Sequence, residues 1–243
     1  KGYYGNLKPD AYVLVATIRA LRYHGGAKKG EYEKPNLAAV EKGIENLKKH
    51  IENGFKWQLK PIVAINHFAT DSEEEINFVK AECEKLGVKA ILADEFTMGG
   101  EGMKALAEEV ASCAFNCGNN FKPLYSVEDS VEHKIETIAK EVYGADSAVF
   151  SQKAKNQLKS IYELGLDKLP ICIAKTQKSL SDDEKKIGRP TGFKVTVREF
   201  EFAAGAGFII PILGDMMRMP GLPSIPAAEG MNIDKDGVIT GLS

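Results

Sequence analysis

Three short apolar runs, each followed by an amphipathic segment, constrain the fold of this 243-residue chain most strongly. The runs are YVLVA (12–16), PIVAIN (61–66) and VKAILA (88–93). Continuous apolar runs of this length are typical of strands that are covered on both faces. Apolar side chains then recur at helical spacing over residues 37–51, 76–83 and 103–110. This alternation predicts an α/β fold, a parallel sheet wound with helices.

The loops that leave the second and third strands are the predicted ligand edge. In parallel sheets, ligands bind outside the carboxyl ends of the strands, which here points to the loops beginning at Asn66 and Asp94. Each loop carries an aromatic residue close to the strand, Phe68 or Phe96. The two rings could form the sides of a flat slot or simply cap the core, and the residues alone favour neither reading. In the first loop, Ser72 and Glu75 predict a capping box that starts the next helix.

The second half of the chain has a more mixed pattern. Helices are predicted over residues 131–142 and 153–164, and PICIAKT (170–176) is strand-like. FKVTVREFEF alternates and then changes register near Glu199, which predicts a bulge or twist. GFIIPIL reads as a further strand, which Pro211 places at an edge or an end.

The composition excludes several classes of partner. The chain is 44% hydrophobic and 27% charged, as is ordinary for a soluble globular protein, and its net charge of −2 predicts no nucleic-acid or membrane partner. No apolar run reaches the roughly 18–20 residues that cross a bilayer. The cysteines form no C-x-x-C pair, so we expect free thiols in a reducing, cytoplasmic compartment and no metal site. They stand at positions 83, 113, 117 and 172.

No complete phosphate-binding motif is present in the sequence. In GGAKKGEY, Gly25 and Gly30 have the spacing of a P-loop, but Glu31 stands where the P-loop has Lys. GAGF (205–208) is too short for a dinucleotide fingerprint and favours a tight turn over a ligand contact. NIDKDG (232–237) resembles the start of an EF-hand loop, but Ser243 replaces the bidentate Glu and a turn is expected. Of the four histidines, only His67 lies on a predicted ligand loop.

Seven segments, in order along the whole chain, resemble formate–tetrahydrofolate ligase. AKTQ-x-SLSDD together with MPGLP-x-x-PAA is highly specific to that family. The resemblance reaches the family's usual C-terminus but begins well inside the family sequence. The segments are TIRALRYHGG, KPIVAINHFATDSEEEI, FTMGGEG, KIETIAKEVYGAD, LPICIAKTQKSLSDD, GAGFIIPILGDMMRMPGLPSIPAAEG and IDKDGVITGLS.

The resemblance implies a reaction, substrates and a fold. ATP phosphorylates formate to formyl phosphate, which the N10 amine of tetrahydrofolate attacks to give 10-formyltetrahydrofolate, ADP and phosphate. ATP-Mg and tetrahydrofolate would be the substrates, and a monovalent cation and a homotetrameric assembly often accompany them in the family. Residues 1–120 would be the latter strands of a P-loop NTPase-like core, and residues 121–243 a mixed α/β C-terminal region.

The resemblance also implies which residues touch substrate. The pterin ring would lie between two aromatic side chains, whose motif positions fall on Phe68 and Phe96, with Leu92, Gly99 and Gly100 beside them. Members that read W-A-K-G-G carry Trp at the second position, so the slot would be slightly smaller here.

The phosphate-binding residues are expected outside this sequence. The family's P-loop, and the arginine that holds formyl phosphate, would lie upstream, so no catalytic residue is assigned in the chain. We expect the C-terminal part of a ligase that is inactive alone. The alternative is a non-catalytic folate-binding or assembly module, such as a split or truncated paralogue. An unrelated NTPase is weaker, because the sequence has neither a phosphate loop nor a base-reading loop.

Overall fold

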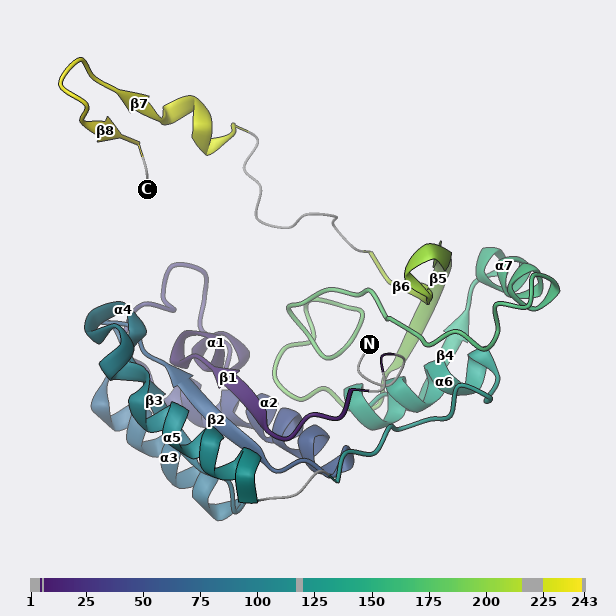
Figure 1. Ribbon diagram of the computed structural model, residues 1–243, viewed down its shortest axis with the longest axis horizontal. Helices are drawn as coiled ribbons and strands as arrows, with labels where there is room; N and C mark the ends of the chain where they lie inside the picture. Colours follow the sequence, from purple (N-terminus) through teal and green to yellow (C-terminus); the bar gives the residue numbers. More distant parts are fainter. Residues whose placement is uncertain (1–4, 6, 117–119, 216–224, 242–243) are drawn as a thin grey trace.

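The first sheet is parallel throughout and confirms the predicted α/β fold. The computed structural model describes residues 5, 7–116, 120–215 and 225–241 (Figure 1). In its first part, the strands β1 (Tyr12–Ala16), β2 (Pro61–Asn66) and β3 (Ala90–Ala93) lie in the order β1-β2-β3. Both strand pairs are parallel. The third strand begins two residues later than the apolar run that predicted it.

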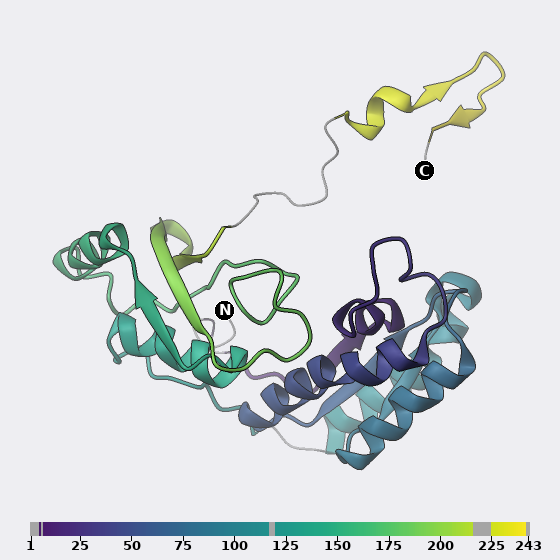
Figure 2. The ribbon, with the colours of Figure 1, turned by 180° about the vertical axis from the view of Figure 1, so that it is seen from behind.

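Helices cover the two faces of this sheet unequally. Val63 and Ile65 belong to the core formed with α1, α2 and α3, whereas Ile62 and Ala64 pack with α5. Figure 1 shows α5 in front of the sheet, and Figure 2 shows the long helix α2 beside α3 on the opposite side. The helices of this part are α1 (Ile18–His24), α2 (Leu37–Lys56), α3 (Glu73–Lys85), α4 (Glu95–Met98) and α5 (Gly100–Asn116).

Close packing between α1 and α2 depends on a glycine. A Cβ atom on Gly43 would stand 1.9 Å from the carbonyl oxygen of Leu21, so no larger residue fits there. The predicted capping box at the start of α3 is confirmed, because Ser72 Oγ accepts from the Glu75 N–H while Glu75 Oε2 accepts from the Ser72 N–H.

The second part of the chain is built on a mixed sheet. Its strand order is β4-β5-β6, in which β4 and β5 are parallel and β5 and β6 are antiparallel. The register shifts between Val197 and Glu199, as the sequence predicted. The elements are α6 (Val131–Ile138), the π-helical turn η1 (Ala139–Tyr143), β4 (Ser147–Phe150), α7 (Gln152–Glu163), β5 (Lys194–Ala203), the 3₁₀ turn η2 (Ala204–Ala206) and β6 (Phe208–Leu213).

The segment PICIAKT forms only isolated bridges, so its prediction as a strand is wrong. It runs parallel to β6, where Cys172 N donates to Ile209 O at 2.9 Å and Ala174 N donates to Pro211 O at 3.0 Å. Pro211 has no N–H with which to continue this ladder. The proline therefore interrupts the pairing of the neighbouring segment while β6 itself remains a strand.

One face of α2 joins the two parts of the chain. Asn46, Lys49 and Asn53 are buried polar residues on this face. They donate to the backbone oxygens of Gly188, Glu141 and Val142 at 2.9, 2.8 and 3.0 Å, respectively. Buried donors of this kind are costly unless they find acceptors, so these bonds fix α2 against the second part.

The C-terminal residues form a small hairpin. It consists of η3 (Ala227–Gly230), β7 (Asn232–Ile233) and β8 (Ile239–Thr240). Asp234 Oδ1 accepts from the N–H groups of Asp236 and Val238, both at 2.9 Å, which makes NIDKDG the expected turn. Residues 216–224, which include the MPGLP motif, lie outside the described residues. Within the described ranges, no helix is long and apolar enough to cross a membrane.

Candidate functional site

The carboxyl ends of β2 and β3 lie side by side and carry both predicted slot residues. His67 N donates to Ala93 O at 2.9 Å, and this bond joins the loop after β2 to the end of β3. Phe68 follows β2 and is 41% exposed, whereas Phe96 lies in α4 after β3 and is 96% exposed. A ring that is almost fully exposed does not cap a core. Phe96 is therefore available to a ligand at this edge of the sheet.

Asp71 fixes the backbone that presents Phe68. Its Oδ2 accepts from Phe68 N at 2.9 Å, and Asp71 N donates to Phe68 O at 2.9 Å, which closes a tight turn. The Asp71 side chain is fully buried, and its Oδ1 lies 3.7 Å from the Arg22 guanidinium. Burial raises the pKa of Asp71, although the Phe68 N–H and the Arg22 charge both oppose that shift.

A buried ion pair between Arg22 and Glu75 stabilises this turn on its inner side. Arg22 Nη2 lies 2.6 Å from Glu75 Oε2, and both side chains are fully buried. Arg22 also donates to the carbonyl oxygens of Tyr32 and Thr70 at 2.7 and 3.0 Å. Burial alone would raise the pKa of Glu75, but hydrogen bonds from Arg22, Asn36 and Ser72 lower it to about 2. Glu75 is therefore a fixed anion that anchors the loop.

His67 and Asp94 face each other across the two loops. His67 Nδ1 lies 3.5 Å from Asp94 Oδ2, and their side chains are 25% and 16% exposed. Within the described ranges, the buried side-chain atoms without a hydrogen-bond partner include His67 Nδ1, Asp71 Oδ1 and Asp94 Oδ1. All three belong to this edge of the sheet. Unsatisfied buried polar atoms are uncommon in native structures, and here they lie where a ligand is expected.

The glycines of GGEG shape the turn between α4 and α5. Gly99 has a φ of +56°, a left-handed conformation that side chains rarely adopt. A Cβ atom on Gly102 would stand 2.2 Å from the carbonyl oxygen of Asp94, whereas one on Gly100 would meet nothing within 4 Å. Gly99 and Gly102 therefore allow α5 to begin close to the backbone of Asp94, and there is open space around Gly100.

Sequence comparison identifies the family. A family model for formate–tetrahydrofolate ligase matches residues 1–243 of the chain. The chain belongs to the formate–tetrahydrofolate ligase family. Members are ligases of one-carbon metabolism, and ATP and tetrahydrofolate are the substrates that the family implies.

The ligase-family site residues named from the sequence do not all lie in the same environment. Phe68, Phe96, Gly99 and Gly100 lie on the loops that follow β2 and β3. Leu92 lies within β3, is half-buried and packs against the core formed by α1, α2 and α3. The sequence pointed to the loop that begins at Asp94, but it gave no role of their own to Asp94, Asp71 or Arg22. Arg22 stands four residues after the apolar Ile18 and so shares its helix face, which was the one available signal.

The weak phosphate motifs have structural explanations in this ligase-family chain. A Cβ atom on Gly25 would stand 1.7 Å from the carbonyl oxygen of Ala39, so this glycine is required where α1 ends against α2. GAGF forms the η2 turn that connects β5 to β6, as expected. Among the described side chains, no group of three or more His, Cys, Asp or Glu is placed to hold a metal ion.

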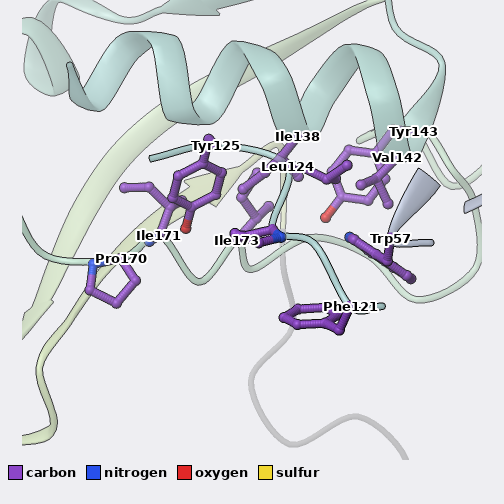
Figure 3. Close-up of a pocket in the computed structure, with 11 residues that line it drawn as sticks. Trp57, Phe121, Leu124, Tyr125, Ile138, Val142, Tyr143, Pro170, Ile171 and Ile173 are labelled. Atoms are coloured by element: carbon purple, nitrogen blue, oxygen red, sulfur yellow. Dashed lines mark hydrogen bonds between the residues drawn. The ribbon is translucent and has the colours of Figure 1, made fainter. Parts of the chain in front are cut away.

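A separate cavity of about 360 Å³ lies where the end of α2 meets the second part of the chain, and the sequence reading missed it. Figure 3 shows the aromatic rings of Trp57, Tyr125 and Tyr143 around it. Ile138, Val142 and Tyr143, at the junction of α6 with the π-helical turn, form one wall. Burial raises the pKa of Tyr143 to about 12, so its hydroxyl stays neutral at ordinary pH.

Proposed function

We propose that this chain forms the tetrahydrofolate-binding part of a formate–tetrahydrofolate ligase, with the pterin ring held between Phe68 and Phe96. The observation that carries the proposal is the position of two exposed aromatic side chains after adjacent parallel strands, at the edge where such sheets bind ligands. The family match over residues 1–243 supports the choice of ligand.

Stacking would stabilise the complex through both rings. Each aromatic face contributes about 0.5–1.5 kcal/mol beyond the burial of apolar area. Phe96 has the most to gain, because it is 96% exposed without a ligand and full burial of a Phe side chain stabilises by about 1.5–3 kcal/mol. Gly100, with open space around it, would leave room for the ligand beside that ring.

The phosphoryl chemistry is assigned to residues outside these 243. ATP would phosphorylate formate, and N10 of tetrahydrofolate would attack the formyl phosphate. Stabilising the transferred phosphoryl group needs cationic groups and a phosphate-binding loop, and the sequence has no G-x-x-x-x-G-K-[ST] segment. We place residues 1–120 in the core region and residues 121–243 in a C-terminal region. Homotetramer formation, stimulation by a monovalent cation and a cytoplasmic location are further parts of the proposal that rest on the family alone.

A non-catalytic module is the second candidate. The absence of a P-loop sequence favours this non-catalytic role. A split or truncated paralogue could lack the P-loop, keep the folate slot and assemble with a partner chain. A separately encoded upstream polypeptide that carries a P-loop would indicate a split enzyme, whereas a reading frame continuous with Lys1 would indicate one longer ligase chain.

A product assay tests the assignment of the chemistry. We expect no 10-formyltetrahydrofolate when this chain alone is incubated with ATP-Mg, formate and tetrahydrofolate, because the groups that stabilise the phosphoryl transfer are missing. Product formed by the purified chain alone would contradict this part of the proposal. Binding of tetrahydrofolate, measured separately, would show whether the slot itself is formed.

A further inference from the structure

The edge that carries Phe68 and Phe96 also carries acceptors that nothing in the described structure satisfies. Asp94 Oδ1 has no hydrogen-bond partner, and Asp94 Oδ2 has only His67 Nδ1 at 3.5 Å. A carboxylate can accept from two parallel donors at once. The Asp94 carboxylate therefore has the capacity to accept two parallel hydrogen bonds.

A second buried carboxylate, that of Asp71, is partly satisfied. The Asp71 side chain is fully buried, yet its Oδ1 has no hydrogen-bond donor, since Arg22 stands 3.7 Å away. Leaving a buried polar atom without a hydrogen bond costs free energy, so such an atom is stabilised when a polar partner binds to it. Asp71 already faces the Arg22 charge in the interior, so the partly exposed Asp94 is the carboxylate that a ligand rich in N–H donors would meet at this edge.

Reduced pterins have the matching chemistry. One edge of the pyrimidine ring presents, in order, the C4 carbonyl acceptor, the N3–H donor and the 2-amino donor. N3–H and the 2-amino group form an amidine-like pair that matches a carboxylate as a guanidinium does. An N–H donor next to that carboxylate can serve the C4 carbonyl. His67 Nδ1 is buried against Asp94, so the ring can supply this donor through a proton on Nε2.

We propose that Asp94 and His67 read the amidine edge of the pterin, Asp94 accepting from N3–H and the 2-amino group and His67 donating to the C4 carbonyl. The inference rests on the proposed folate site and adds the groups that give it specificity. Stacking between Phe68 and Phe96 accepts any flat ring, so it cannot select a pterin alone. Asp94 stands two residues before Phe96, which places the reading group and the stacking group on one short segment.

The test compares two ligands on the wild-type chain. One is tetrahydrofolate, and the other is its analogue in which a methyl group replaces the 2-amino group. We expect calorimetric titration to show tetrahydrofolate binding more tightly by about 10- to 100-fold, because the analogue leaves the Asp94 carboxylate half-paired. Equal affinity for the two ligands would overturn the assignment and leave the folate site standing. No binding of either ligand would overturn the folate site, and this assignment with it.

Variants then locate the recognition at Asp94. Asp94→Asn should lower the affinity for tetrahydrofolate and remove the preference for the 2-amino group, because the amide presents a donor where an acceptor is needed. Glu95→Gln makes the same change of charge at the exposed neighbouring residue and should change neither quantity. His67→Ala should weaken binding of both ligands equally. A preference that persists in Asp94→Asn would contradict the proposal.

Discussion

At the scale of residues, one buried ion pair connects four segments of the site. Arg22 lies in α1, its partner Glu75 in the first turn of α3, and together they bond to Tyr32 O, Asn36 N and Thr70 O. The Arg22–Glu75 pair therefore holds the loop that presents Asp71 and Phe68. Removing one member of a buried pair leaves an uncompensated charge, which costs more than the pair contributes.

Glu75→Gln should destabilise the protein strongly. The amide removes the closest counter-ion of the buried Arg22 charge and leaves only Asp71, at 3.7 Å, so the free energy of unfolding should fall by about 3 kcal/mol. Glu74→Gln, at the exposed position beside it, removes the same charge and should change stability by less than about 0.5 kcal/mol. Urea denaturation of the three proteins gives the comparison. Similar losses in the two variants would mean that the pair does not support the loop.

Sequence reasoning found half of this arrangement. The Ser72–Glu75 capping box could be predicted because its members are three residues apart and its geometry is local. The Arg22 partner is 53 residues away, and no periodicity reports a contact at that distance. For the same reason the sequence pointed to Phe68 and Phe96 from their place after strands but gave no role to the Asp94 and Asp71 side chains, because their unpaired oxygen atoms are visible only in the folded structure.

At the scale of elements, the loop between Thr176 and Phe193 is held to the first part of the chain by side-chain bonds. Gly188 N donates to His24 Nδ1 at 3.1 Å. Arg189 forms a bidentate pair with the Glu52 carboxylate, with both N–O distances at 2.7 Å. His24 must be neutral to accept this bond. Burial, together with the nearby His50, lowers the pKa of His24 to about 4.

Stability should therefore fall as the pH is lowered from about 6.5 towards 4. Between these two pH values His24 is protonated in the unfolded chain but stays neutral in the folded chain, because its pKa is lower in the folded chain. Lowering the pH therefore favours unfolding. His24→Gln keeps an acceptor oxygen but cannot titrate, and its free energy of unfolding should depend less on pH over the same window. Urea titrations at several pH values measure the difference.

A matched histidine provides the control for this prediction. His133 lies exposed on α6, so His133→Gln should keep the pH dependence of the wild-type protein. Parallel stability curves for the wild-type protein and His24→Gln would show that the bond to Gly188 contributes nothing to the pH dependence.

At the scale of the whole molecule, the parallel sheet wound with helices followed from sequence patterns, whereas the coverage of the sheet did not. The runs at 12–16 and 61–66 became strands of the predicted parallel sheet with their predicted bounds. The prediction that all strands are covered on both faces holds for β2 but not for β1, where Val15 remains 63% exposed. Val15 pairs with Ala64, on the sheet face that α5 covers, and α5 packs mainly against β2 and β3.

The most direct test of the proposed slot is a calorimetric titration of the chain with tetrahydrofolate. The wild-type protein should bind it, and the double variant Phe68→Ala with Phe96→Ala should lose at least about tenfold in affinity, because both stacking faces are gone. Phe115→Ala, which removes another exposed ring on α5, should bind as the wild type does. ATP-Mg should give no tight binding, because the phosphate-binding groups are assigned elsewhere. Failure of the folded wild-type chain to bind tetrahydrofolate, or unchanged affinity in the double variant, would contradict the slot between Phe68 and Phe96.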